Sequence, residues 1–179
     1  MNRRSVLALL GSGGVLLAEA LYWSKRWRYI TIHHSGGNYG DVELLRRVHR
    51  ERQPRDRIDE IPYHFLIGNG NGLGLGEVVE TGRWRNGLWG AHVSGRNMDR
   101  NMRGIGICLI GDFEKTQVPE VQLQAAITLT RSLMLRFHIR PADVTLHGKT
   151  PGEMTLCPGR NFPGDRFMRA IVQDEVETS

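Results

Sequence analysis

The segment from Ile105 to Ile110 constrains the fold of this chain more than any other feature of its sequence. It is a continuous apolar run bounded by Gly104 and Gly111, and it lacks the polar alternation of a strand with one face in water. Such a run is typical of a central strand that is buried on both faces of its sheet. The sequence therefore predicts an α/β fold in which helices pack on a central sheet.

Other segments supply the remaining elements of this expected fold. Tyr29–Ile32 is a β-branched apolar strand that runs into His33 and His34. Shorter strands are predicted at residues 63–67, 77–80 and 143–146, and helices at residues 41–52 (with Asp41 as N-cap), 119–138 and 163–175. Residues 87–103, rich in Gly, Asn and Arg, are expected to form a long loop. The sequence has no internal repeat, so we predict a single domain, residues 29–179, with one mixed sheet.

The distribution of charge excludes one class of partner. The formal net charge is +5 and the pI is about 9.7, values that invite a nucleic-acid role. Residues 1–28 hold five Lys or Arg and one Glu, a net charge of +4, which leaves +1 for residues 29–179. A nucleic-acid-binding domain needs a basic surface of its own. We therefore expect no nucleic-acid partner.

Residues 1–20 are predicted to be an export signal. Arg3 and Arg4 precede an apolar stretch, and Ala18-Glu19-Ala20 provides a small-residue cleavage site. The arginine pair also fits a twin-arginine signal. The alternative is an uncleaved membrane anchor over residues 6–23, since about 20 apolar residues span a bilayer. Both interpretations place the domain outside the cytoplasm, in the periplasm or cell envelope, behind a basic linker at residues 21–28. Membrane contact is then expected only through an uncleaved leader.

Several metal-binding residue types fall at strand ends beside glycine-rich loops. The chain has seven histidines and two cysteines, and those at such positions are His33 or His34, His92, His147 and Cys157. A catalytic zinc site takes three ligands from His, Cys and carboxylates and leaves the fourth position to water. The chain has no compact zinc signature, so spacing alone leaves the ligand set open. A lone histidine is more often a hydrogen-bonded structural residue.

A set of short motifs, in a fixed order, identifies a family. They are Ile32-His33-His34-Ser35-Gly36-Gly37, Pro62-Tyr63-His64-Phe65, Gly90-Ala91-His92, the run from Gly104 to Phe113, His147, and Cys157-Pro158-Gly159. Together they resemble the zinc-dependent N-acetylmuramoyl-L-alanine amidases, the type that includes phage endolysin amidases and the peptidoglycan recognition proteins. The resemblance covers nearly all of residues 29–175. It implies hydrolysis of the amide bond between N-acetylmuramic acid and L-alanine, with peptidoglycan or a muropeptide as substrate, and we expect a monomer.

The resemblance also implies the metal ligands. The zinc histidine after the first strand matches His33, the second histidine matches His147, and the third ligand matches Cys157. A zinc ion with an open position lowers the pKa of bound water to about 7, which suits hydrolysis. Successive side chains on a strand face opposite ways, so His34 is expected to pack or to form a supporting hydrogen bond instead.

Two further positions match catalytic residues of the family. Tyr63 matches the catalytic tyrosine, whose phenol can donate a hydrogen bond to the developing oxyanion; on its own it would be interpreted as a half-buried strand tyrosine. Thr155 stands two residues before Cys157, where some relatives have a lysine that assists the oxyanion. With threonine there, Tyr63 is expected to contribute more of the stabilisation of the oxyanion. Lys149 is in the same loop, but nothing in the sequence places it at the metal.

The expected substrate contacts come from three residues. His64 and His92 match residues that line the cleft and touch substrate in relatives, although each can also be a structural histidine. Asn101 or Asn97 matches a substrate-facing asparagine, and Asn101 is favoured by its distance from the strand that begins at Ile105.

Two other functions are compatible with these residues. The first is a peptidoglycan-binding module of the same fold without hydrolysis; family members used for recognition commonly lack the cysteine ligand, whereas this chain has Cys157. The second makes Cys157 the nucleophile of a cysteine hydrolase with His147 as its base. Cys108 stands in the middle of an apolar strand, so inert burial is expected there rather than a disulfide with Cys157.

Overall fold

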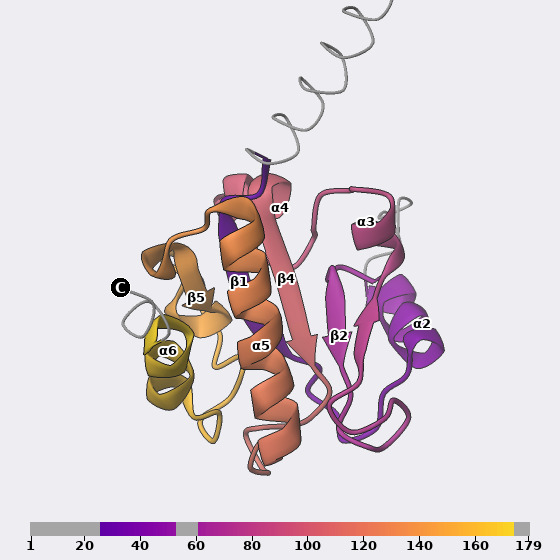
Figure 1. Ribbon diagram of the computed structural model, residues 1–179. Helices are drawn as coiled ribbons and strands as arrows, with labels where there is room; N and C mark the ends of the chain where they lie inside the picture. Colours follow the sequence, from indigo (N-terminus) through magenta and orange to yellow (C-terminus); the bar gives the residue numbers. More distant parts are fainter. Residues whose placement is uncertain (1–25, 53–60, 174–179) are drawn as a thin grey trace, which may run out of the picture.

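A computed structural model of the protein describes residues 26–52 and 61–173. These residues form a five-stranded sheet in the order β3-β2-β4-β1-β5 (Figure 1). The strands are β1 (Tyr29–His34), β2 (Phe65–Ile67), β3 (Val78–Glu80), β4 (Gly104–Leu109) and β5 (Val144–Leu146). β3 runs antiparallel to β2, and the other neighbouring strands are parallel. The predicted fold class, a single α/β domain with a mixed sheet, is confirmed.

The central strand β4 is buried along its whole length, as the sequence predicted. Its side chains alternate between two hydrophobic clusters. Ile105, Ile107 and Leu109 face the larger cluster, which α5 and α6 complete. Cys108 lies in the second cluster with residues that include Leu45 of α2. The sheet therefore has one face covered by α5 and α6, and a second face on which α2 packs.

The long helices follow the predicted segments closely. They are α2 (Val42–Arg52), α5 (Glu120–Phe137) and α6 (Gly164–Val172). The Leu44 amide donates to the Asp41 carboxylate at 2.7 Å, so Asp41 is the N-cap of α2. Figure 1 shows α5 lying across β1 and β4, with α6 beside it. The last helix was predicted to run to about residue 175; the structure gives α6 an end at Val172, and residues 174 and 175 lie outside the described part of the chain.

The prediction of a loop over residues 87–103 is wrong in its second half. This segment contains the short helices η1 (Gly95–Asn97) and α4 (Met98–Arg103). α4 is one short segment of six residues, and its two apolar side chains, Met98 and Met102, are both exposed, so no buried apolar stripe marks it as a helix. Polar contacts support it instead, including an ion pair between Arg103 and Asp99 at 2.6 Å. Three other short helices were not predicted: α3 (Gly82–Arg85), η2 (Pro141–Asp143) and η3 (His147–Lys149).

The packed domain starts before the expected boundary at Tyr29. The Trp27 side chain is 3% exposed, and its ring lies edge-on to His64 at 4.9 Å between centroids. The leader at residues 1–20 and most of the linker at 21–28 lie outside the described residues. In the part of the chain that the structure does describe, no helix has the length and apolarity needed to cross a membrane.

Candidate metal centre

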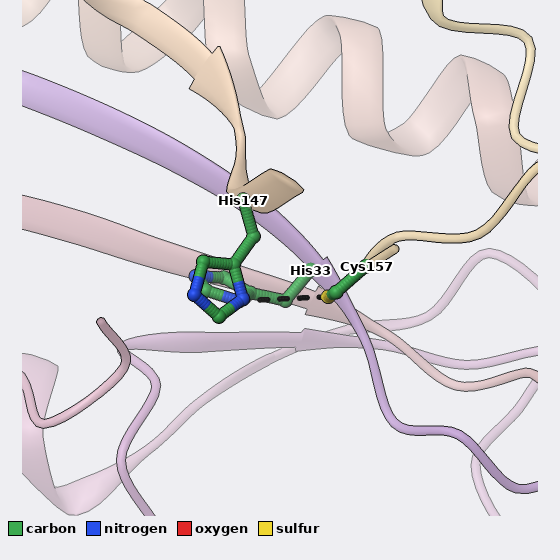
Figure 2. Close-up of side chains that lie close together, drawn as sticks. All are labelled: His33, His147 and Cys157. Atoms are coloured by element: carbon green, nitrogen blue, oxygen red, sulfur yellow. Dashed lines mark hydrogen bonds between the residues drawn. The ribbon is translucent and has the colours of Figure 1, made fainter. Parts of the chain in front are cut away.

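His33, His147 and Cys157 come together at one end of the sheet. One potential ligand atom from each lies within 4.8 Å of the others. Ile32 of β1 is paired with Leu146 of β5, so the residues that follow, His33 within β1 and His147 just after β5, stand at the same level on adjacent parallel strands. Cys157 reaches them from the loop before α6. Figure 2 shows the three side chains pointing toward one another.

Hydrogen bonds orient the His33 ring. Its Nδ1 lies 3.8 Å from the Cys157 sulfur, and its Nε2 lies 3.1 Å from Nδ1 of His92. When the Nδ1 lone pair of His33 faces the cluster, Nε2–H of His33 donates to Nδ1 of His92. Nε2–H of His92 then faces the Gly104 carbonyl oxygen at 3.5 Å. This tautomer chain satisfies each ring and leaves one nitrogen of His33 available to a metal ion.

Both imidazoles of the cluster are held neutral. Burial lowers the pKa of His33 well below its usual range, and the nearby histidines add to the effect. Burial also lowers the pKa of His147, although the Glu153 carboxylate opposes this. A neutral imidazole is the form that binds a metal. At neutral pH both rings therefore present a lone pair.

The Cys157 sulfur is held by the backbone of β1. The His34 amide donates to Sγ at 3.4 Å, and the Cys157 amide donates to the Thr155 hydroxyl at 3.1 Å. Burial raises the pKa of the Cys157 thiol to about 12. A bound cation supplies the charge that a thiolate needs there. Two imidazoles and one thiolate form a donor set suited to a tetrahedral divalent metal such as zinc.

The side chain of His34 faces the other way, as predicted. Its Nδ1 accepts the Phe113 amide at 3.2 Å, and the two rings lie 5.9 Å apart. The alternation of side chains along a strand therefore predicted correctly that only one of the two histidines, His33, faces the cluster.

Tyr63 lies beside the cluster, in the segment before β2 rather than in the predicted strand. Its ring centroid is 5.0 Å from that of His33 and 5.5 Å from that of His49, a residue of α2 that the sequence did not single out.

Cys108 is fully buried, as expected, and burial raises the pKa of its thiol well above the usual range. The Tyr63 side chain opposes this rise in the pKa of Cys108 in part.

The structure gives His64 and His92 supporting positions. His64 is fully buried, its Nε2 lies 3.0 Å from the Leu88 carbonyl, and its Nδ1 accepts the Gly106 amide. No ring nitrogen of His64 is left for a substrate. His92 is 5% exposed and supports His33 through the contact described above.

Asn101 is likewise occupied by the protein. It is 6% exposed, its side-chain oxygen accepts the amides of His92 and Val93, and its amide nitrogen donates to the Val93 carbonyl. These bonds fix the backbone that carries His92. Asn97, the alternative candidate, donates to Glu153 at 2.6 Å. Both asparagines therefore hold the surroundings of the metal centre in place.

Comparison with known proteins agrees with this geometry. A family model described as N-acetylmuramoyl-L-alanine amidase matches residues 23–160. This chain belongs to that amidase family. A peptidoglycan-recognition protein of Drosophila simulans is 34% identical over 140 residues, which are 75% of this chain and 70% of that protein.

Solved structures of the amidase family share the fold. The N-acetylmuramoyl-L-alanine amidase LysC from Clostridium intestinale has a TM-score of 0.66 at 28% identity, over 82% of this chain and 86% of that chain. The Drosophila peptidoglycan recognition protein SA has a TM-score of 0.58 at 25% identity, over 79% of this chain and 78% of that chain. The family thus includes proteins named for hydrolysis and proteins named for recognition.

Besides His49, sequence reasoning missed Glu153, a residue of the site in this amidase-family chain. Its Oε2 lies 3.2 Å from Nε2 of His147. Burial raises the pKa of its carboxyl, but the hydrogen bonds it accepts, those from Ser94 and Asn97 foremost, outweigh this and lower the pKa to about 2. One signal in the sequence could have found it: Glu153 is a carboxylate in the loop between the expected ligands His147 and Cys157. Metal-binding histidines commonly donate their second N–H to a carboxylate.

Gly106→Ala is expected to disturb the His92 support. A Cβ at Gly106 would lie 2.7 Å from the His92 ring, so the ring must move away from His33. Overpacking of this kind costs about 1–3 kcal/mol of the free energy of unfolding. Urea denaturation measures it, with Gly95→Ala as the matched control because a Cβ there meets nothing within 4 Å. Equal stability of the two variants would contradict the prediction.

Proposed function

We propose that this amidase-family chain is a zinc-dependent N-acetylmuramoyl-L-alanine amidase. Its substrate is then bacterial peptidoglycan or a muropeptide, and it hydrolyses the amide bond between N-acetylmuramic acid and L-alanine. The observation that carries the proposal is the convergence of His33, His147 and Cys157 within 4.8 Å. When bound there, zinc supplies a Lewis acid that activates water and polarises the scissile carbonyl.

The side chains around the cluster have distinct tasks in this proposal. The Tyr63 phenol, next to His33, is the donor to the carbonyl oxygen as negative charge develops on it. Thr155 orients Cys157, because its hydroxyl accepts the Cys157 amide. His92 holds the ring of His33.

The remaining expectations about partners and location belong to the same proposal. Relatives of this chain are named peptidoglycan-recognition proteins, which supports peptidoglycan as the partner. Peptidoglycan lies outside the cytoplasm, so the proposal includes export of the domain. It also includes the monomeric state expected from the family resemblance. The export signal itself falls on residues 1–20, outside the described part of the chain.

The names of these relatives also favour a second candidate, a peptidoglycan-binding module without hydrolysis. The cysteine-hydrolase alternative is less favoured by the contacts. Nε2 of His147 faces Glu153, and the ring nitrogen recorded beside the Cys157 sulfur is Nδ1 of His33. Burial raises the pKa of the Cys157 thiol to about 12, which leaves it protonated and weakly nucleophilic at neutral pH without a metal.

Digestion of purified peptidoglycan tests the proposal. The zinc-loaded protein is expected to release peptides with new L-alanine amino termini, detected by amine labelling and mass spectrometry, without new reducing sugar ends. Binding to the polymer with no new amino termini would favour the recognition module and overturn the proposed hydrolysis.

A further inference from the structure

We propose that Glu153 is a positioning residue that fixes the tautomer of His147 and fastens the metal-binding loop to the segment at residues 94–97. The inference rests on the proposed metal centre. It gives a role to the buried Glu153 carboxylate and to the helices η1 and α4. The proposed reaction does not otherwise use these parts of the structure.

The two carboxylate oxygens of Glu153 have separate partners. Oε1 accepts the Ser94 amide at 3.0 Å, the Ser94 hydroxyl at 2.7 Å and the Asn97 side-chain amide at 2.6 Å. Oε2 is left for Nε2 of His147, at 3.2 Å. The Glu153 side chain is 5% exposed, so little water competes for these positions. The direction of the carboxylate is therefore set by Ser94 and Asn97, and its remaining oxygen is aimed at His147.

This contact decides which nitrogen of His147 carries the proton. A neutral imidazole has one N–H and one lone pair, and a carboxylate only accepts hydrogen bonds. The proton of His147 therefore resides on Nε2, and the lone pair on Nδ1 is available to the cluster with His33 and Cys157. The opposite tautomer would place a proton on the nitrogen that a metal needs.

Glu153 also links two separate supports of the cluster. His147 and Cys157 stand at the two ends of one loop, and Asn97 holds the middle of that loop through Glu153 and through the Pro151 carbonyl at 3.0 Å. The same neighbourhood fixes His92 through Asn101, and His92 supports His33. The backbone from residue 92 to 101 thus braces both imidazoles of the metal centre.

Glu153→Gln gives a sharp test because the replacement keeps the shape but adds a donor. The three donors of Ser94 and Asn97 will hold the new side-chain oxygen, which turns its NH₂ group toward Nε2 of His147. That nitrogen must then accept, and the proton moves to Nδ1. Glu77→Gln is the matched control: the Glu77 carboxylate also accepts a backbone amide, that of Gly74 at 2.7 Å, outside the metal centre.

Two measurements are made on the full chain without substrate. Nitrogen-15 NMR of the metal-free protein reports the His147 tautomer, expected as Nε2–H in the wild type and in Glu77→Gln, and as Nδ1–H in Glu153→Gln. Competition with a chromophoric chelator reports the zinc Kd, expected to rise by about 10- to 100-fold in Glu153→Gln alone.

An Nδ1–H tautomer in the wild type would overturn the inference even if Glu153→Gln fails to fold. An unchanged zinc Kd or an unchanged tautomer in a folded Glu153→Gln would overturn it as well. Neither readout needs peptidoglycan, so the proposed amidase activity can fail while the role of Glu153 stands.

Discussion

Cys157→Ala is expected to abolish tight zinc binding and to remove nearly all hydrolysis of peptidoglycan. The change deletes the one thiol of the three donors that lie within 4.8 Å of one another and leaves two neutral imidazoles. A metal contributes several kcal/mol to a hydrolytic transition state. Since about 1.4 kcal/mol corresponds to a factor of ten, turnover should fall by roughly 10³-fold or more. Metal analysis of the purified protein and amine release from peptidoglycan measure the two effects.

Cys108→Ala is the matched control for metal content. Cys108 is the other cysteine of the chain, buried and outside the three-residue cluster, so its replacement should leave bound zinc unchanged. A chelator separates the remaining alternatives. The zinc enzyme loses activity in chelator and regains it with added zinc, whereas a cysteine hydrolase survives chelation and is inactivated by thiol alkylation. Full turnover by Cys157→Ala would rule out both mechanisms.

Tyr63→Phe is expected to lower kcat by about 10²- to 10³-fold with zinc content unchanged, the usual loss for one oxyanion donor. The substitution removes only the hydroxyl and retains the ring that packs beside His33 and His49. Steady-state kinetics on a soluble muropeptide, with metal analysis of the same sample, measure the effect.

Tyr29→Phe is the control for loss of a tyrosine hydroxyl. Tyr29 is the first residue of β1, at the opposite end of that strand from His33, and the Arg100 guanidinium lies over its ring at 4.5 Å from the centroid. The turnover of Tyr29→Phe should match that of the wild type. A wild-type kcat for Tyr63→Phe would refute the oxyanion role, and loss of zinc from Tyr63→Phe would show that the residue supports the metal ligands instead.

Much of the fold, and the choice of His33 over His34, could be predicted because the signals are local. The unbroken apolar run of β4 requires a sheet covered on both faces, and the structure buries every residue of that strand. Strand alternation distinguishes His33 from His34. The grouping of His147 and Cys157 with His33 came from the family resemblance, since their separation along the sequence carries no compact spacing.

The outer support of the cluster could not be predicted, because it consists of contacts between distant segments. Glu153 and Ser94 are far apart in sequence, and their hydrogen bond leaves no periodic pattern. The helix α4 is only six residues long and its apolar side chains, Met98 and Met102, are exposed, so a loop was predicted there. His64 was expected at the substrate, but only the folded chain shows both of its ring nitrogens bound to backbone groups.

The pairing of Ile32 with Leu146 limits where this protein tolerates changes in length. Neighbouring side chains on a strand point to opposite faces, so a one-residue deletion within β5 would turn His147 away from His33. Deletions inside this edge strand should therefore be fatal to metal loading, whereas substitutions that keep its length and apolar character should be tolerated.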